Sequence, residues 1–158
     1  MATYVVRAAE KLRRQRQRAA ALTVYTRTSP FIPAFYSQAA STRLDLPSND
    51  TAVLLEATLP LVDRIFRPHR QLAKAGVLMQ HLQGTDTLQS HLMVPMSAEQ
   101  QGKRECLMQT IDRLNQRYGR GTVHWAACGL QPGWMMRRER LSRAATTRLS
   151  DLPTIHAR

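Results

Sequence analysis

The chain has 158 residues, 43% of them hydrophobic and only 6% aromatic, so it can bury a mostly aliphatic core in one domain or two small ones. Its 23 Lys and Arg against 11 Asp and Glu give a formal net charge of +12, which favours a polyanionic partner, nucleic acid first and an anionic membrane surface second. The sequence has no run of about 18 apolar residues that would span a bilayer, and Cys106 and Cys128 lack a paired spacing, so we expect a cytoplasmic chain without disulfides.

The first predicted element is a strongly basic helix over residues 2–18. Val5, Ala9 and Leu12 recur on it at helical spacing. Its one acidic residue, Glu10, stands against Arg7, Lys11, Arg13, Arg14, Arg16 and Arg18. This imbalance cannot be neutralised by pairing within the helix, so contact with phosphates and a plain solvated face are both open interpretations.

A half-buried strand is predicted next, over residues 20–29, because the residues alternate and favour β-structure. Its apolar face would carry Leu22, Val24 and Thr26, and its polar, partly cationic face Thr23, Tyr25 and Arg27. The segment 30–47 is rich in Pro, Ser and Thr, which predicts a loop with at most a short strand near Leu44.

A second helix and a second alternating segment follow. Asp50 is predicted to cap a helix that runs from Thr51 to about Phe66 and contains Pro60. Residues 71–82 then alternate, with Lys74, Gly76 and Leu78 on one side. A glycine inside a strand, two residues from a lysine, suits the close approach of a phosphate, and a simple bulge is the alternative.

The C-terminal half begins with a linker that contains the string Leu88-Gln-Ser-His-Leu-Met93. Ser97-Ala-Glu-Gln100 has the form of a capping box and predicts a helix that ends at Gly119 and Gly121. The apolar stripe of that helix would be Leu107, Ile111, Leu114 and Tyr118. Residues 122–127 are predicted as a short strand before a basic tail. The element order predicts an α+β fold: a small antiparallel or mixed sheet with helices on one face, then a small helix-strand extension.

The residues for catalysis or metal binding do not cluster in the sequence. The 11 acidic residues are dispersed without a D-x-D pair, and the 5 histidines lack the spacing of metal ligands. A nucleophile built from Cys128 and His124 would lack a third, orienting group. No Gly-rich phosphate loop is present. We therefore expect no catalytic residue, metal site or cofactor in this chain.

Several runs of residues together resemble the UmuC type of Y-family translesion DNA polymerase, in register over almost the whole chain. They are A-E-K-L-R-R-Q at 9–15, L-T-V-Y-T-R-T-S-P-F at 22–31, N-D-T at 49–51, K-A-G-V at 74–77, L-M-Q-T-I-D-R-L-N-Q-R-Y-G-R-G-T-V at 107–123 and M-M-R-R-E-R-L-S at 135–142.

The resemblance implies a C-terminal fragment of such a polymerase, with a role in SOS DNA repair and mutagenesis. Residues 1–83 would form most of the little-finger DNA-binding domain without its first strand, residues 84–96 a linker, and residues 97–158 a C-terminal extension. The catalytic carboxylates and their Mg²⁺ would belong to a palm domain outside this chain, so the fragment is expected not to be an enzyme on its own.

The resemblance also implies site residues and partners. Arg13, Arg14, Arg16, Arg27, Lys74 and Gly76 would contact the DNA backbone without reading its sequence. Gln89, Leu92 and Met93 match the Gln, Leu and Phe of a sliding-clamp-binding motif, and Met93 in place of an aromatic anchor should weaken docking. Further implied partners are a UmuD-type subunit and the RecA filament. The alternative hypothesis is an autonomous basic module that binds DNA or RNA and has no connection to polymerisation.

Overall fold

The computed structural model of the chain describes residues 1–85, 98–130 and 142–155. The first stretch contains α1 (Ala2–Arg14), β1 (Gln17–Arg27), β2 (Ser37–Ser48), α2 (Thr51–Ile65) and β3 (Lys74–Gly84). The long helix α3 (Ala98–Tyr118) and two single turns of 3-10 helix, η1 (Ala126–Cys128) and η2 (Leu149–Asp151), follow. The predicted α+β class is confirmed.

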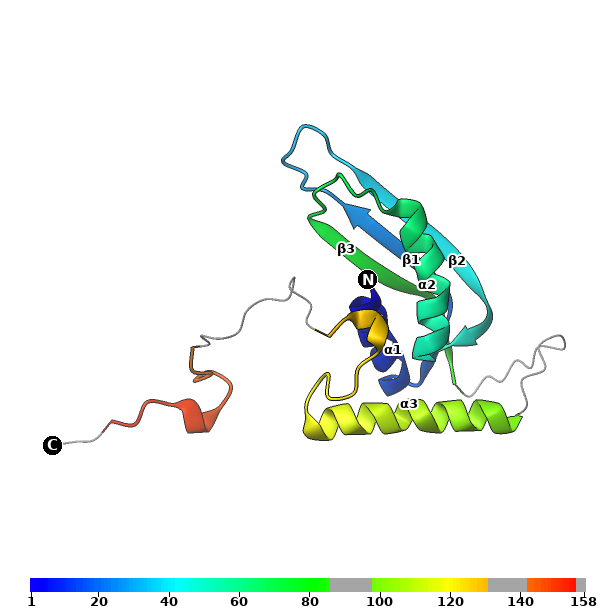
Figure 1. Cartoon of the computed structure of the whole chain (residues 1–158). Helices are drawn as coiled ribbons and strands as arrows, with labels where there is room; N and C mark the ends of the chain where they lie inside the picture. Colours follow the sequence, from blue (N-terminus) through cyan, green and yellow to red (C-terminus); the bar gives the residue numbers. More distant parts are fainter. Residues whose placement is uncertain (86–97, 131–141, 156–158) are drawn as a thin grey trace.

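The three strands form one antiparallel sheet in the order β2-β1-β3. The central strand β1 places Leu22 opposite Thr42 on β2 and opposite Met79 on β3. Figure 1 shows α1 and α2 on one face of this sheet and α3 running across the lower end of both helices. The predicted packing of helices on a single face of the sheet is therefore confirmed.

The core lies between the sheet and its two helices. Leu22 and Val24 are fully buried there, as their alternation on β1 predicts. They pack in one cluster with Val5, Ala9 and Leu12 from α1 and with Leu54, Leu55, Leu61 and Ile65 from α2. Full burial of one such aliphatic side chain contributes about 1.5–3 kcal/mol, so this cluster is the main stabilising feature of residues 1–85.

The ends of the helices follow local rules. The Asp50 side chain accepts a hydrogen bond of 2.8 Å from the Ala52 backbone N–H, so the predicted cap of α2 is confirmed. Pro60 lies inside α2 as predicted. The helix α1, however, ends at Arg14 and not at Arg18, because β1 starts at Gln17 and its first residues pair with β3. Gly119 and Gly121 follow α3 with positive φ angles of 107° and 88°.

The loop predicted over residues 30–47 is wrong for most of its length, because Ser37–Ser48 forms the twelve-residue strand β2. The segment contains small polar residues with weak β preference, and its strand conformation depends on pairing with β1 along the hairpin. Pro47 is tolerated in β2 because the strand lies at an edge of the sheet. An edge position needs hydrogen-bond donors on one side only.

The expectations for the C-terminal half need two corrections. Residues 122–127 do not form a strand; they form a turn and the start of η1, whose neighbour Trp125 packs against the core. The docking face of α3 is also different from the predicted stripe, since Met108 is 3% exposed whereas Leu107 is 54% exposed. No helix of the described residues is both long and apolar enough to cross a membrane.

Candidate nucleic-acid interface

The face of the sheet that points away from α1 and α2 is the candidate surface. Ala40, Leu44, Val77 and Met79 pack towards the core, so the residues alternating with them point the other way. The register then gives this surface, called the open face below, the following residues: Ala21, Thr23, Tyr25, Arg27, Ser37, Ala39, Ser41, Arg43, Lys74, Gly76, Leu78 and Gln80.

Two cations sit opposite each other on the open face. Arg27 on β1 is the register partner of Lys74 on β3, and Lys74 is exposed. Directly opposed side chains in an antiparallel pair have Cβ atoms about 4.5–5.5 Å apart, and like charges at that separation destabilise the pair. Neither side chain has an ion pair or hydrogen bond within the described part of the chain. An anion bound between them would relieve this repulsion.

A third cation of the open face, Arg43, is one that sequence reasoning missed. It lies on β2 opposite Ala21 and is exposed. The alternation of residues within 37–45 could have placed Arg43 on a strand face. It was overlooked because this segment was predicted to be a loop. Asp45, two residues further along, is exposed as well and offsets part of the positive charge at this end.

A chain of hydrogen bonds crosses the middle of the open face. The Thr23 hydroxyl donates to Gln80 Oε1 on β3 at 2.8 Å. Its oxygen is also 2.8 Å from the Ser41 hydroxyl on β2, which must supply the proton because Thr23 has only one to donate. These two bonds tie side chains from all three strands together, so the polar part of the open face has a fixed shape.

Gly76 is buried beneath an aromatic ring. A Cβ added to Gly76 would lie 2.5–2.6 Å from the hydroxyl oxygen and two ring carbons of Tyr25, its register partner on β1. The glycine therefore makes room for the Tyr25 ring, and this close packing replaces the open approach to the backbone that the sequence suggested for a phosphate. The result is a tyrosine held flat on the open face, two residues from Arg27.

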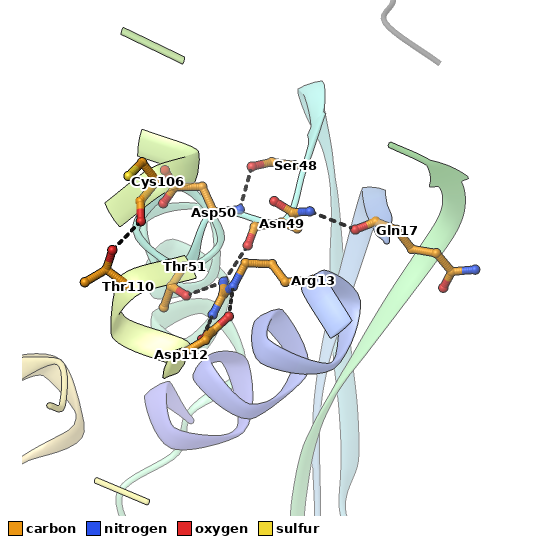
Figure 2. A network of polar contacts seen from close by, with 9 residues as sticks. All are labelled: Arg13, Gln17, Ser48, Asn49, Asp50, Thr51, Cys106, Thr110 and Asp112. Atoms are coloured by element: carbon orange, nitrogen blue, oxygen red, sulfur yellow. Dashed lines mark hydrogen bonds and ion pairs between the residues drawn. The ribbon is translucent and has the colours of Figure 1, made fainter. Parts of the chain in front are cut away.

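Arg13 lies away from the open face, where the end of α1 meets the start of α2 and the helix α3 (Figure 2). Its Nε and Nη2 donate to the two carboxylate oxygens of Asp112 on α3, each at 2.7 Å. Its Nη1 donates to the backbone oxygen of Asn49 at 2.7 Å and to the Thr51 hydroxyl at 3.0 Å. With these partners and a side chain only 10% exposed, Arg13 has a structural role, which corrects the predicted DNA contact.

Two further ion pairs attach α3 at the same joint. Arg18 Nη2 lies 2.7 Å from Glu105 Oε1, and Arg104 Nε lies 3.2 Å from Asp50 Oδ2. Asp50 thus caps α2 and binds α3 at once. Two of the basic residues in this region, Arg13 and Arg18, are therefore neutralised by acids of α3, and their guanidinium groups are not free to bind phosphates.

The remaining predicted site residues fall into two groups. Arg14 and Arg16 are exposed, but they lie at the end of α1 beside α3 and not on the open face. Gln89, Leu92 and Met93 lie outside the described residues. Within the described ranges, no group of three or more His, Cys, Asp or Glu could hold a metal ion.

Comparison with known proteins gives matches over both halves of the chain. Residues 1–92 match the impB/mucB/samB family C-terminal domain, and residues 105–155 match a domain of unknown function, DUF4113. Protein SamB of Salmonella typhimurium is 37% identical over 149 residues, which cover 93% of this chain and 34% of SamB. Protein UmuC of Salmonella typhimurium is 34% identical over 152 residues, 95% of this chain and 36% of UmuC. For protein MucB of Escherichia coli the identity is 32%, over 95% of this chain and 35% of MucB. The chain spans about a third of the length of these relatives.

Proposed function

The chain belongs to the impB/mucB/samB family, and we propose that residues 1–85 hold DNA for a translesion polymerase through the open face of the sheet. The observation that carries this proposal is the pair of directly opposed cations, Arg27 and Lys74, which have no anionic partner within the described residues. Nucleotide incorporation would be the task of other domains of such a polymerase.

The composition of the open face favours contacts to phosphates over contacts to bases. Its cations are Arg27, Arg43 and Lys74, spread over all three strands. Contacts to phosphates position a protein on DNA without carrying sequence information, and each one releases counterions. This mode suits a polymerase that must follow the template whatever its sequence. The Tyr25 ring adds an aromatic surface between the cations.

The test compares two double variants of the 158-residue chain that lose the same charge. Arg27→Gln/Lys74→Gln removes cations of the open face. Arg64→Gln/Lys11→Gln removes exposed cations of α2 and α1. Fluorescence anisotropy with a labelled duplex should show about tenfold weaker binding for the first variant and less than about twofold for the second. Equal losses of DNA affinity in the two variants would show that only net charge matters and would refute the role of the open face.

We also propose that Gln89, Leu92 and Met93 tether the chain to a sliding clamp. The support is the order of a hydrogen-bonding glutamine and two apolar residues in this string. Gln89→Ala should lower the amount of clamp retained by the immobilised chain, and Met93→Phe should raise it, because an aromatic anchor buries more rigid area. Ser90→Ala is the control within the string. If the immobilised wild-type chain retains no clamp, the proposed tethering is refuted.

The remaining roles rest on family membership and resemblance alone. A primer-extension assay with Mg²⁺ is expected to show no incorporation by this chain, and any incorporation would contradict the proposed division of labour. A UmuD-type subunit and the RecA filament stay predicted partners in SOS mutagenesis. Retention of either protein by the immobilised chain would support that partner, and the absence of retention at micromolar concentrations would argue against it.

A further inference from the structure

A shallow cleft that is open to solvent lies between the end of α1 and the second half of α3. Its volume is about 350 Å³, and its charged lining residues are Glu10, Arg13, Arg14, Arg16, Asp112 and Arg113. This volume lies at the lower end of the range for small-molecule sites, about 300–1,000 Å³. The cleft is separate from the open face, because α1 packs on the other side of the sheet (Figure 1).

The cleft has a surplus of positive charge. Arg13 and Asp112 neutralise each other through their two 2.7 Å hydrogen bonds. The three other guanidinium groups, those of Arg14, Arg16 and Arg113, then face the single carboxylate of Glu10. These three arginines are exposed, and in residues 1–85, 98–130 and 142–155 their side chains have no ion pair or hydrogen bond.

The frame around these arginines is fixed. Asp112, the neighbour of Arg113, is held by Arg13, so the docking of α3 also sets the position of Arg113 opposite α1. Arg16 has a φ angle of 52°, in the left-handed region that few residues other than glycine adopt. Its backbone is held on both sides, by a bond from its N–H to Arg13 O and by another from Thr85 N–H to its own oxygen, each 3.0 Å.

We propose that this cleft binds a phosphate group. A guanidinium presents planar paired donors that match phosphate oxygens. Three of them, from α1, the turn that follows it and α3, can share the three free oxygens of a terminal phosphate. A carboxylate offers two oxygens and one charge, and would meet repulsion from Glu10 with less compensation. The phosphate could be the end of a free polyphosphate or the 5′-terminal phosphate of a nucleic-acid strand, and the test below separates these sources. The site does not depend on DNA binding by the open face.

The experiment uses the 158-residue chain carrying Arg27→Gln/Lys74→Gln, so that contacts to the open face are removed. Tripolyphosphate binding is followed by calorimetry. Binding of a single-stranded oligonucleotide with a 5′-phosphate and a label at its 3′ end is followed by anisotropy. Arg14→Gln and Arg113→Gln should each weaken binding about three- to tenfold. Glu10→Gln should tighten it, because it removes the one opposing carboxylate. Thermal melts by circular dichroism confirm that each variant is folded.

Arg7→Gln is the matched control, because Arg7 is exposed on α1 two turns before Arg14 and does not line the cleft. It should change affinity less than about twofold. Losses seen with tripolyphosphate assign the site to a free polyphosphate, and losses seen only with the oligonucleotide assign it to a strand. The proposal is overturned if Arg14→Gln and Arg113→Gln bind both probes like the parent, if Arg7→Gln loses as much, or if a Glu-rich peptide binds more tightly than tripolyphosphate.

Discussion

The region 1–85 and the helix α3 are held in place by different physical forces. In the first region, aliphatic side chains from both helices and the sheet meet in one buried cluster. Among the side chains of α3 whose burial is described, one apolar side chain, Met108, is buried, and ion pairs from Asp112, Glu105 and Arg104 help to attach the helix. Apolar burial changes little with moderate salt, whereas exposed ion pairs are screened.

The three ion pairs that join α3 to residues 1–85 are not equivalent. Arg13 and Asp112 have side chains that are 10% and 18% exposed, whereas Glu105 is 47% exposed and Arg104 is 44% exposed. Charges shielded from water interact more strongly, so the attachment of α3 depends mainly on the Arg13–Asp112 pair and on Met108.

The largest expected difference between the two regions comes from leucine truncations. Leu54→Ala in the core should lower the free energy of unfolding by about 2–5 kcal/mol, because it leaves a cavity in the buried cluster. Leu107→Ala on α3 should change it by no more than about 0.5 kcal/mol, since this side chain is exposed. Urea denaturation followed by circular dichroism measures both. Similar losses for the two variants would contradict the contrast.

The second-largest expected loss of stability comes from substitution of Gly76, the glycine packed under the Tyr25 ring. Gly76→Ala should destabilise the chain by about 1–3 kcal/mol, because the new methyl group would overlap the Tyr25 ring. In a Tyr25→Ala background the same substitution should cost much less. Gly84→Ala is the control on the same strand, since nothing lies within 4 Å of its added Cβ. Urea denaturation of the wild type, the two single variants and the double variant shows whether the effects of Gly76→Ala and Tyr25→Ala are coupled. Additive effects would argue against packing between these two residues.

Breaking the shielded ion pair should have an effect of about 1–3 kcal/mol, because Asp112→Ala leaves the Arg13 guanidinium without its carboxylate. A double-mutant cycle with Arg13→Gln isolates the coupling between the two side chains. In Asp112→Ala, limited proteolysis should cleave α3 faster than in the wild type, while cleavage within residues 1–85 should change little. Lys103→Ala, which removes an exposed pair within α3, is the control. Unchanged proteolysis in Asp112→Ala would show that α3 is attached by other contacts.

The exposed pairs should have the smallest effect. Glu105→Gln is expected to weaken the docking of α3 by about 0.2–1 kcal/mol at low salt. The difference should vanish near 1 M NaCl, where the Debye length falls to about 3 Å. Proteolysis rates of α3 at both salt concentrations measure this. A difference that persists at high salt would mean that Glu105 acts through packing and not through its charge.

Local signals in the sequence predicted a large part of the fold. The cap at Asp50 and the faces of β1 follow from a few neighbouring residues, and both are confirmed. The strand β2 was missed because its small polar residues have little preference of their own and take strand conformation only by pairing with β1. The length of α1 was overestimated because the basic pattern continues into the first residues of β1.

The candidate site was predictable only in part. Alternation put Arg27 on the polar face of β1 and Lys74 on the Gly76 side of β3, and the register shows that these two faces are the same face of the sheet. Pattern alone could not distinguish Arg13 from Arg14, because the acid that holds Arg13 is 99 positions away along the chain. The function of Gly76 was likewise hidden, since it depends on the register that brings the Tyr25 ring over it. Contacts between residues far apart in the sequence therefore decide which arginines are paired within the chain and which can contact DNA.

The most direct test of the central claim is the salt dependence of DNA binding by the 158-residue chain and by Arg27→Gln/Lys74→Gln. If these two cations each neutralise a phosphate, the plot of log affinity against log salt concentration should lose about 1.8 units of slope in the variant, at about 0.9 per phosphate. An unchanged slope, or a wild-type affinity that does not respond to salt, would contradict the proposal that the open face holds the DNA backbone.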